Sequence, residues 1–315
     1  MTGPSVTAAP AATPAASPVP RERARRPWSR DRVETLIFRW LKWIIIAGFA
    51  VVTLFPFYYM VLLSVRTIQQ LLLSPGRLFP TAADFTIATY KAVLEPVSAG
   101  GEGFLILLRN SGVVSVLTVL LTLIIAIPGA YAVTRLRFPG RRHANLLFVS
   151  VYLFPSIVLA IPLFVLFTRL GLRGSLPGLV LVYISQTVPI AIYMLRNYFE
   201  TVPRSLEEAA AADGCSRLKV LWHVSLPLAR PAIMATALYV FMIAWNEYLF
   251  ALLFLIDNRS NWTVSLGLAQ LSSSIQIPTT ILMAGSVILT VPILVLFFFT
   301  ERLLTEGLTA GAEKG

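Results

Sequence analysis

The run "NSGVVSVLTVLLTLIIAIPGAYAVT" (residues 110–134) decides the fold, because it contains no Asp, Glu, Lys or Arg. A helix of about 20 apolar residues is long enough to cross the hydrocarbon core of a bilayer. In lipid, such a helix satisfies its own backbone donors and acceptors. The run therefore predicts a transmembrane helix.

Five further apolar runs predict an all-α, polytopic membrane protein. The chain is 57% hydrophobic and only 13% charged, with a mean hydropathy of +0.76, whereas a soluble domain carries about 25% charged residues. One run contains a single acidic residue, Glu247. Pro155, Pro162, Pro189 and Pro292 lie inside the runs and predict kinks. The six expected crossings are residues 43–65, 110–134, 144–168, 174–195, 231–256 and 279–300.

The basic residues predict the orientation of the chain. Its net charge is +11, and most of the 26 Lys and Arg residues lie in the two terminal segments and the loops near 135–143 and 196–230. By the positive-inside rule, both termini are expected in the cytoplasm and the protein in the cytoplasmic (inner) membrane. Residues 21–32 either serve as a topology anchor only, which is the favoured interpretation, or also lie against anionic membrane lipid. No basic groove with interleaved aromatic residues indicates nucleic-acid binding.

Composition divides the chain into three parts. Residues 1–35 are predicted to form a disordered, basic, cytoplasmic N-terminal tail, because they begin with an Ala-, Pro-, Ser- and Thr-rich stretch. Residues 36–304 are expected to form the six-helix transmembrane domain, with a core at about 105–304. Residues 305–315 form a C-terminal cytoplasmic tail.

The loop "TVPRSLEEAAAADGCSRLKVLWHVSLPLARP" (201–231) interrupts the apolar runs. Ser205 and Glu208 have the spacing of a capping box, which predicts a helix start at Ser205. The alanine-rich segment that follows favours a helix, and Gly214 supplies a left-handed stop. Ser216 is expected to cap a second helix that runs to Ser225. The loop is thus predicted to be helix, sharp turn and helix on the cytoplasmic side.

This loop resembles the EAA loop of ATP-binding-cassette (ABC) importer permeases. Glu208, Ala209 and Ala210 are followed at the family's spacing by Gly214 and by the ending at 224–227. The sequence departs only at Val224, where isoleucine is commonest. Further stretches are similar to the maltose-type, carbohydrate-transporting group: "AYAVTRLRFPGR" (130–141), "WNEYLFALLFL" (245–255) and the C-terminal "RLLTEGLTAGAEKG" (302–315). The resemblance implies the core of a type I importer permease.

The resemblance also implies partners. These are a second homologous permease, two copies of an ABC ATPase and an extracytoplasmic solute-binding protein. The first helix of the loop would dock on the ATPase, through Ser205, Glu207, Glu208, Ala209, Ala210, Asp213, Gly214, Leu226 and Pro227. The C-terminal tail would touch the ATPase pair through Gly307, Leu308, Thr309 and Gly311.

Catalysis by this chain is not expected. A phosphate-binding P-loop needs Gly-Lys followed by Ser or Thr, and none of the lysines, at 42, 91, 219 and 314, follows a glycine. ATP and Mg are therefore expected on a partner ATPase, with no cofactor in this chain. His143 and His223 belong to no metal-spaced cluster, so no metal site is expected.

Polar residues within the crossings are the candidates for substrate contact. Glu247 lies deep in the fifth crossing, where an unpaired carboxylate is costly, so it either lines the pathway or bonds between helices. The other candidates are Asn110, Tyr183, Gln186, Asn246 and Tyr248. The resemblance implies a carbohydrate substrate, which would be an oligosaccharide, a monosaccharide or a polyol. Glycerol-3-phosphate is the alternative substrate, with Arg109 and Arg169 as the candidate anion contacts. A secondary transporter would instead need several buried charges or paired broken helices.

Overall fold

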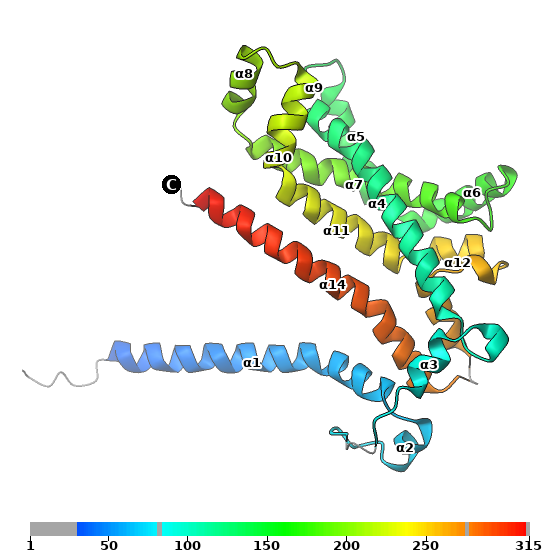
Figure 1. Ribbon diagram of the computed structural model, residues 1–315. Coiled ribbons are helices and arrows are strands. Elements are labelled where there is room, and N and C mark those ends of the chain that lie inside the picture. The colour runs from blue at the N-terminus through cyan, green and yellow to red at the C-terminus, as the bar shows by residue number, and fades with distance from the viewer. Residues whose placement is uncertain (1–29, 81–83, 275–276, 313–315) are drawn as a thin grey trace, which may run out of the picture. The chain divides into compact units, whose positions relative to one another are not determined.

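The protein is all-α, as expected. The computed structural model describes residues 30–80, 84–274 and 277–312, and every regular element in these ranges is helical. The chain divides into two compact units, residues 1–55 and 56–315 (Figure 1). The expected tail 1–35 lies mostly outside the described residues, although α1 (Arg30–Ser64) already begins within it.

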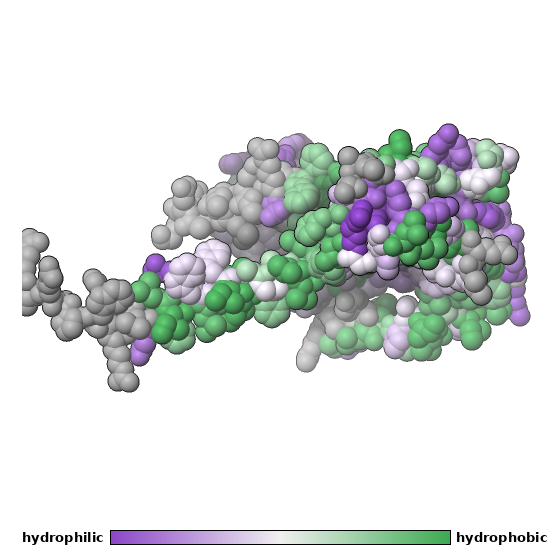
Figure 2. Space-filling view, turned by 90° about the horizontal axis from the view of Figure 1, so that it is seen from below, coloured by the Kyte–Doolittle hydropathy of each residue, from purple (hydrophilic) through white to green (hydrophobic). Residues whose placement is uncertain are grey.

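Helix α1 supplies the described part of the first unit. From Trp43 onward its sequence is continuously apolar, and Figure 2 shows apolar residues along the face in view. A helix that is apolar on all sides is suited to burial or to lipid. Pro56 lies inside α1, at the start of the second unit.

Helices α4 (Phe104–Arg135), α7 (Leu176–Thr201) and α11 (Arg230–Asn246) form the centre of the second unit. Small residues let α4 and α7 approach closely, which is typical of helix contacts in membranes. A Cβ added to Gly129 on α4 would lie 3.2 Å from Ile192 on α7. The hydroxyls of Thr122 and Thr187 lie 2.7 Å apart and join the same two helices.

Among the described residues, four helices are long and apolar enough to span a membrane: Glu34–Ser64, Phe104–Arg135, Leu176–Thr201 and Thr279–Glu301. They correspond to the predicted first, second, fourth and sixth crossings. The last of them is the first part of α14 (Thr279–Ala312), which packs against α11 and α3 (Ala88–Leu94).

The third crossing is broken at Pro155, where a kink was predicted, and the fifth is broken at Glu247, where none was predicted. The third is divided into α5 (Arg141–Leu153) and α6 (Ser156–Arg169), because Pro155 disfavours helical geometry at Phe154, which is extended at φ −76° and ψ 126°. The fifth is divided into α11 and α12 (Leu249–Leu255), because Glu247 is also extended, at φ −64° and ψ 129°. Pro162, Pro189 and Pro292 lie within helices.

The shorter elements lie in the connections. Those outside the loop of 201–231 are α2 (Ile68–Leu73), η2 (Val97–Ala99), η4 (Arg259–Asn261) and α13 (Val264–Ser273). Those in that loop are α8 (Arg204–Ala212), α9 (Arg217–Val220), the π-helical turn η3 (Leu221–Ser225) and α10 (Leu226–Leu228).

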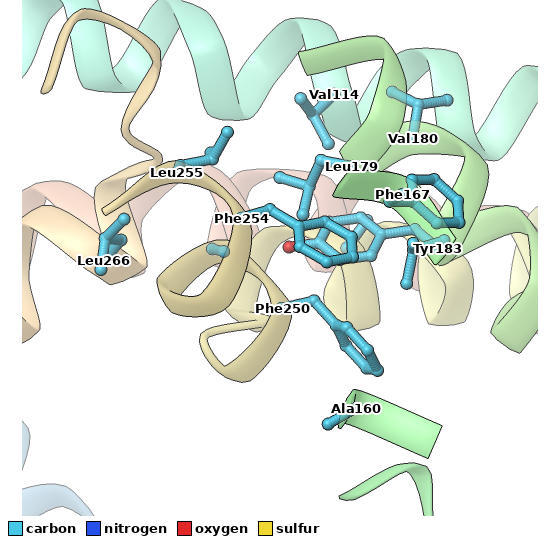
Figure 3. Packing of buried hydrophobic residues seen from close by; sticks show 13 residues of the cluster. Val114, Ala160, Phe167, Leu179, Val180, Tyr183, Phe250, Phe254, Leu255 and Leu266 are labelled. Atoms are coloured by element: carbon cyan, nitrogen blue, oxygen red, sulfur yellow. The ribbon is translucent and has the colours of Figure 1, made fainter. Parts of the chain in front are cut away.

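An aromatic cluster holds the broken crossings against α7 (Figure 3). The ring of Phe254 on α12 stacks on Phe167 of α6 at 5.3 Å between centroids and contacts Phe250 at 6.0 Å. Tyr183 of α7 is fully buried in this cluster. The packing therefore fixes the position of the Tyr183 hydroxyl.

Candidate functional site

Helix α8, the first helix in the loop of residues 201–231, begins at Arg204. Its N-cap is Pro203, with φ −59°, and no side chain caps the helix. The capping box predicted from Ser205 and Glu208 is therefore wrong. Because the helix begins one residue earlier than Ser205, that residue lies in the first turn instead of at the cap.

The predicted end of this helix is confirmed. Gly214 is left-handed, with φ +85°. The backbone N–H of Cys215 donates to Ala210 O, and that of Gly214 donates to Ala211 O, both at 3.0 Å. These two bonds form a Schellman motif, which satisfies carbonyls at the helix end and fixes the turn.

The second helical segment is continuous from α9 to α10 but changes its pitch. Ser216 caps α9, as predicted, by accepting from the backbone N–H of Lys219. The π-helical turn η3 then leads to Leu226 and Pro227, which open α10. The segment Arg217–Leu228 meets α11 at 78°, so the loop turns sharply before the next crossing.

Helix α8 has an exposed face and a buried contact. Ser205, Glu208 and Ala209 are exposed, as are Asp213 and Gly214 after the helix. Glu207 points inward: its Oε1 lies 2.9 Å from Arg135 Nε of α4 and accepts a hydrogen bond from Ser225 Oγ at 2.9 Å. Glu207 therefore holds α8 to its own chain and does not share the exposed face.

Glu247 occupies the break between α11 and α12. The Tyr183 hydroxyl donates to its Oε2 at 2.6 Å, and the backbone N–H groups of Phe250 and Ala251 donate to its carboxylate at 2.9 and 3.2 Å. Its carbonyl accepts from Ser265 Oγ at 2.7 Å. A carboxylate used in this way caps α12 and fixes a helix junction, which favours the packing interpretation of Glu247.

The other pathway candidates do not form one site. Asn110 donates to the carbonyls of Ser260 and Trp262 at 2.8 and 3.0 Å, which ties α4 to the η4 connection. Asn246 is exposed and donates to Met242 O, and Tyr248 is exposed. Within the described chain, the only hydrogen bond between two of these six candidates is that of Tyr183 with Glu247.

Gln186 is different because its Nε2 is buried without a hydrogen-bond partner in the described structure. It lines a cavity of about 360 Å³ beside the broken third crossing. Phe154, Phe250 and Ser185 also line this cavity. An unsatisfied buried donor is costly, so a ligand or water that accepted from Gln186 would be favoured there.

For the predicted C-terminal contact residues, the structure describes only the backbone. Helix α14 continues through Gly307, Leu308, Thr309 and Gly311 to Ala312, while the side chains of 302–315 lie outside the described part of the structure. Their contact with an ATPase stays a prediction. Among the described residues, no group of three His, Cys, Asp or Glu side chains is placed to hold a metal.

Comparison with known proteins identifies the family. Residues 119–306 match the model of "Binding-protein-dependent transport system inner membrane component". The chain belongs to this family. The secondary-transporter alternative is therefore excluded.

Relatives and solved structures agree with this assignment of the permease. It is 37% identical to the inner membrane ABC transporter permease protein YcjP of Escherichia coli, over 86% of this chain and 94% of the relative. It is 36% identical to the trehalose/maltose transport system permease protein MalG of Thermococcus litoralis, over 84% and 93% of the two chains. A crystal structure of a bacterial ABC transporter involved in the import of alginate matches with a TM-score of 0.72 and 25% identity, covering 87% of the permease and 98% of that chain.

Sequence reasoning missed Arg135 and Ser225 as parts of the loop site. One signal was available, since neighbouring helix residues point about 100° apart. Glu207 and Glu208 thus cannot share one face, and the inward carboxylate needs a partner. The nearest sequence clue was Arg135, which ends the second apolar run of the permease.

Proposed function

We propose that this permease forms part of the membrane pathway of an ATP-driven carbohydrate importer and couples to a separate ATPase through α8. The observation that carries this proposal is the exposed face of α8, ended rigidly at Gly214 and joined to α4 through Glu207. Such a helix offers a partner a fixed surface with small alanine side chains, which permit close approach. The ATPase would bind ATP and Mg, and the permease would hold no cofactor.

Carbohydrate is the substrate class favoured by the relatives' names. Besides the trehalose/maltose relative, the permease is 33% identical to the trehalose transport system permease protein SugB of Mycobacterium tuberculosis. The transporter in the matched crystal structure is involved in the import of a polysaccharide, alginate. These similarities support a sugar or oligosaccharide substrate over glycerol-3-phosphate.

The remaining partners follow from the family. A binding-protein-dependent system needs an extracytoplasmic solute-binding protein, and a second homologous permease would complete the pathway, with two ATPase copies below. The concentration of basic residues in the two terminal segments and in the loops near 135–143 and 196–230 supports cytoplasmic termini. In this orientation α8 faces the ATPase.

Gln186 is the pathway candidate with the strongest structural support. Its free donor can bond to a sugar hydroxyl, and the rings of Phe154 and Phe250 in the same cavity are suited to a sugar's apolar face. Tyr183 and Glu247 would support this wall by fixing the break in the fifth crossing.

Reconstitution tests the proposed function. The permease is purified with the second permease and the ATPase that assemble with it and is placed in liposomes with the binding protein. Uptake of labelled maltose, trehalose and glycerol-3-phosphate is then measured. ATP-dependent uptake of a sugar is expected only in the presence of the binding protein. Uptake of glycerol-3-phosphate alone, or sugar uptake without an ATPase, would contradict the proposal.

A further inference from the structure

A buried ion pair joins α8 to the end of a transmembrane helix. Arg135 Nε and Glu207 Oε1 lie 2.9 Å apart, and the two side chains are only 7% and 11% exposed. Arg135 is the last residue of α4, and Glu207 lies in the first turn of α8. The pair therefore connects segments far apart in the sequence.

Two more hydrogen bonds extend this connection. Arg135 Nη2 donates to Val202 O at 2.8 Å, at the end of α7. Ser225 Oγ of η3 donates to the same Glu207 oxygen that Arg135 contacts. The polar cluster of Arg135, Glu207 and Ser225 thus links α4 and the end of α7 to both helical segments of the loop.

The end of α4 is held from a second direction. Arg141, at the start of α5, donates through Nε to Val133 O at 2.6 Å and through Nη2 to Thr134 O at 2.9 Å. These bonds satisfy carbonyls in the last turn of α4. Arg135 therefore lies at an ordered helix end.

Burial makes the polar cluster resistant to separation. Loss of one partner from a buried ion pair strongly destabilises the folded protein, because the remaining charge is buried without compensation. A surface ion pair contributes little, because solvent and salt screen it. Arg196 and Glu200 provide the contrast: they also lie 2.9 Å apart, but both belong to α7 and are 25% and 44% exposed. Of these two pairs, only the buried one joins different helices.

We infer that Arg135 and Glu207 are positioning residues that transmit displacement of α8 to α4 during the transport cycle. Ser225 holds the carboxylate in the orientation that this link requires. The inference rests on the proposed docking of α8 on the ATPase, but it assigns the step that follows docking. Without the link, α8 still binds the ATPase, and its movement is absorbed by the loop.

Glu207→Gln tests this inference in the reconstituted complex. The amide removes the charge but keeps the size and an acceptor for Ser225. The variant is expected to assemble with the ATPase and to hydrolyse ATP, while sugar imported per ATP hydrolysed falls by about fivefold or more, as expected when coupling between sites is lost. Glu200→Gln, which breaks the exposed pair on α7, is the matched control and should leave this ratio unchanged.

If Glu207→Gln leaves the sugar imported per ATP hydrolysed unchanged, the inference is overturned. This includes the case in which uptake and hydrolysis fall in parallel, because a merely structural role lowers both together. If Glu207→Gln does not accumulate in the membrane, Ser225→Ala decides instead, since it leaves both charges in place. A lower ratio in Ser225→Ala supports the link, and an unchanged ratio overturns it.

A double-mutant cycle tests whether the two residues act together. The amount of sugar imported per ATP hydrolysed is compared in Arg135→Met, Glu207→Gln and the double variant. If the pair is one link, the double variant should be no worse than the worse single variant. Multiplied losses would show independent roles and contradict the inference.

The variant Glu208→Arg separates this inference from the proposed function. Glu208 lies on the exposed face of α8, so its replacement should prevent assembly with the ATPase. If assembly is intact in Glu208→Arg, the proposed docking fails, whatever Glu207→Gln shows. If assembly is lost there but Glu207→Gln has an unchanged ratio, docking stands and the link through Arg135 fails.

Discussion

The Tyr183 hydroxyl donates a hydrogen bond to Glu247 Oε2 at 2.6 Å, joining α7 to the break in the fifth crossing. The same carboxylate accepts backbone N–H groups at the start of α12. The backbone of Glu247 therefore ends α11, while its side chain joins the start of α12 to α7. This arrangement explains an acidic residue deep in an apolar run without requiring substrate contact.

Tyr183→Phe removes this bond and leaves the ring in place. It is expected to lower the stability of the solubilised permease by about 1–3 kcal/mol, because a buried carboxylate loses a donor. Thermal unfolding in detergent measures the loss, and half-saturation of uptake should stay unchanged. A shifted half-saturation with unchanged thermal stability would instead place Glu247 on the pathway.

Gly214→Ala tests the turn that ends α8. The residue is left-handed at φ +85°, and a Cβ there would meet no atom within 4 Å, so the cost is backbone strain alone, about 1–2 kcal/mol. Gly100 has the same φ and the same open surroundings, in the connection between α3 and α4. Thermal stability should fall equally in Gly214→Ala and Gly100→Ala.

Sugar uptake distinguishes the two glycines. It should fall in Gly214→Ala, because the turn orients the proposed docking helix, and stay at the parent level in Gly100→Ala. Equal uptake in both variants would show that the turn at Gly214 has no role beyond stability.

The apolar runs and the loop were predictable because they depend on local rules. Lack of charge over 110–134 is enough to predict α4, and Gly214 followed by Ser216 marks a helix end and a new cap. Pro155 predicted the break beside Phe154, because the residue before a proline is disfavoured in a helix. The break at Glu247 was missed, because apolar composition alone does not predict backbone geometry.

Long-range contacts account for what the sequence could not predict about the site. The partner of Glu207 lies 72 positions earlier in the chain, at Arg135, and that of Glu247 lies 64 positions earlier, at Tyr183. Sequence spacing gives no such pairing without the packed helices. The capping box failed for a local reason, since Pro203 starts the helix before Ser205.

Gln186→Leu tests the proposed sugar contact. It removes a buried donor that has no partner in the described structure, so thermal stability should be equal to or higher than that of the parent, by about 1 kcal/mol. Half-saturation of sugar uptake should rise if Gln186 bonds to the substrate. Val188→Leu, at another partly buried position of α7, is the control, and equal uptake kinetics in both variants would contradict the contact.

Site-specific cross-linking tests the central claim most directly. In a Cys215→Ser background, Ala209→Cys places a thiol on the exposed face of α8, and Phe85→Cys places one at an exposed position just before α3. With a short bifunctional thiol-to-amine reagent, the account predicts that Ala209→Cys links the permease to the ATPase and that Phe85→Cys does not. Absence of the ATPase from the Ala209→Cys product, in a complex that still imports sugar, would contradict coupling through α8.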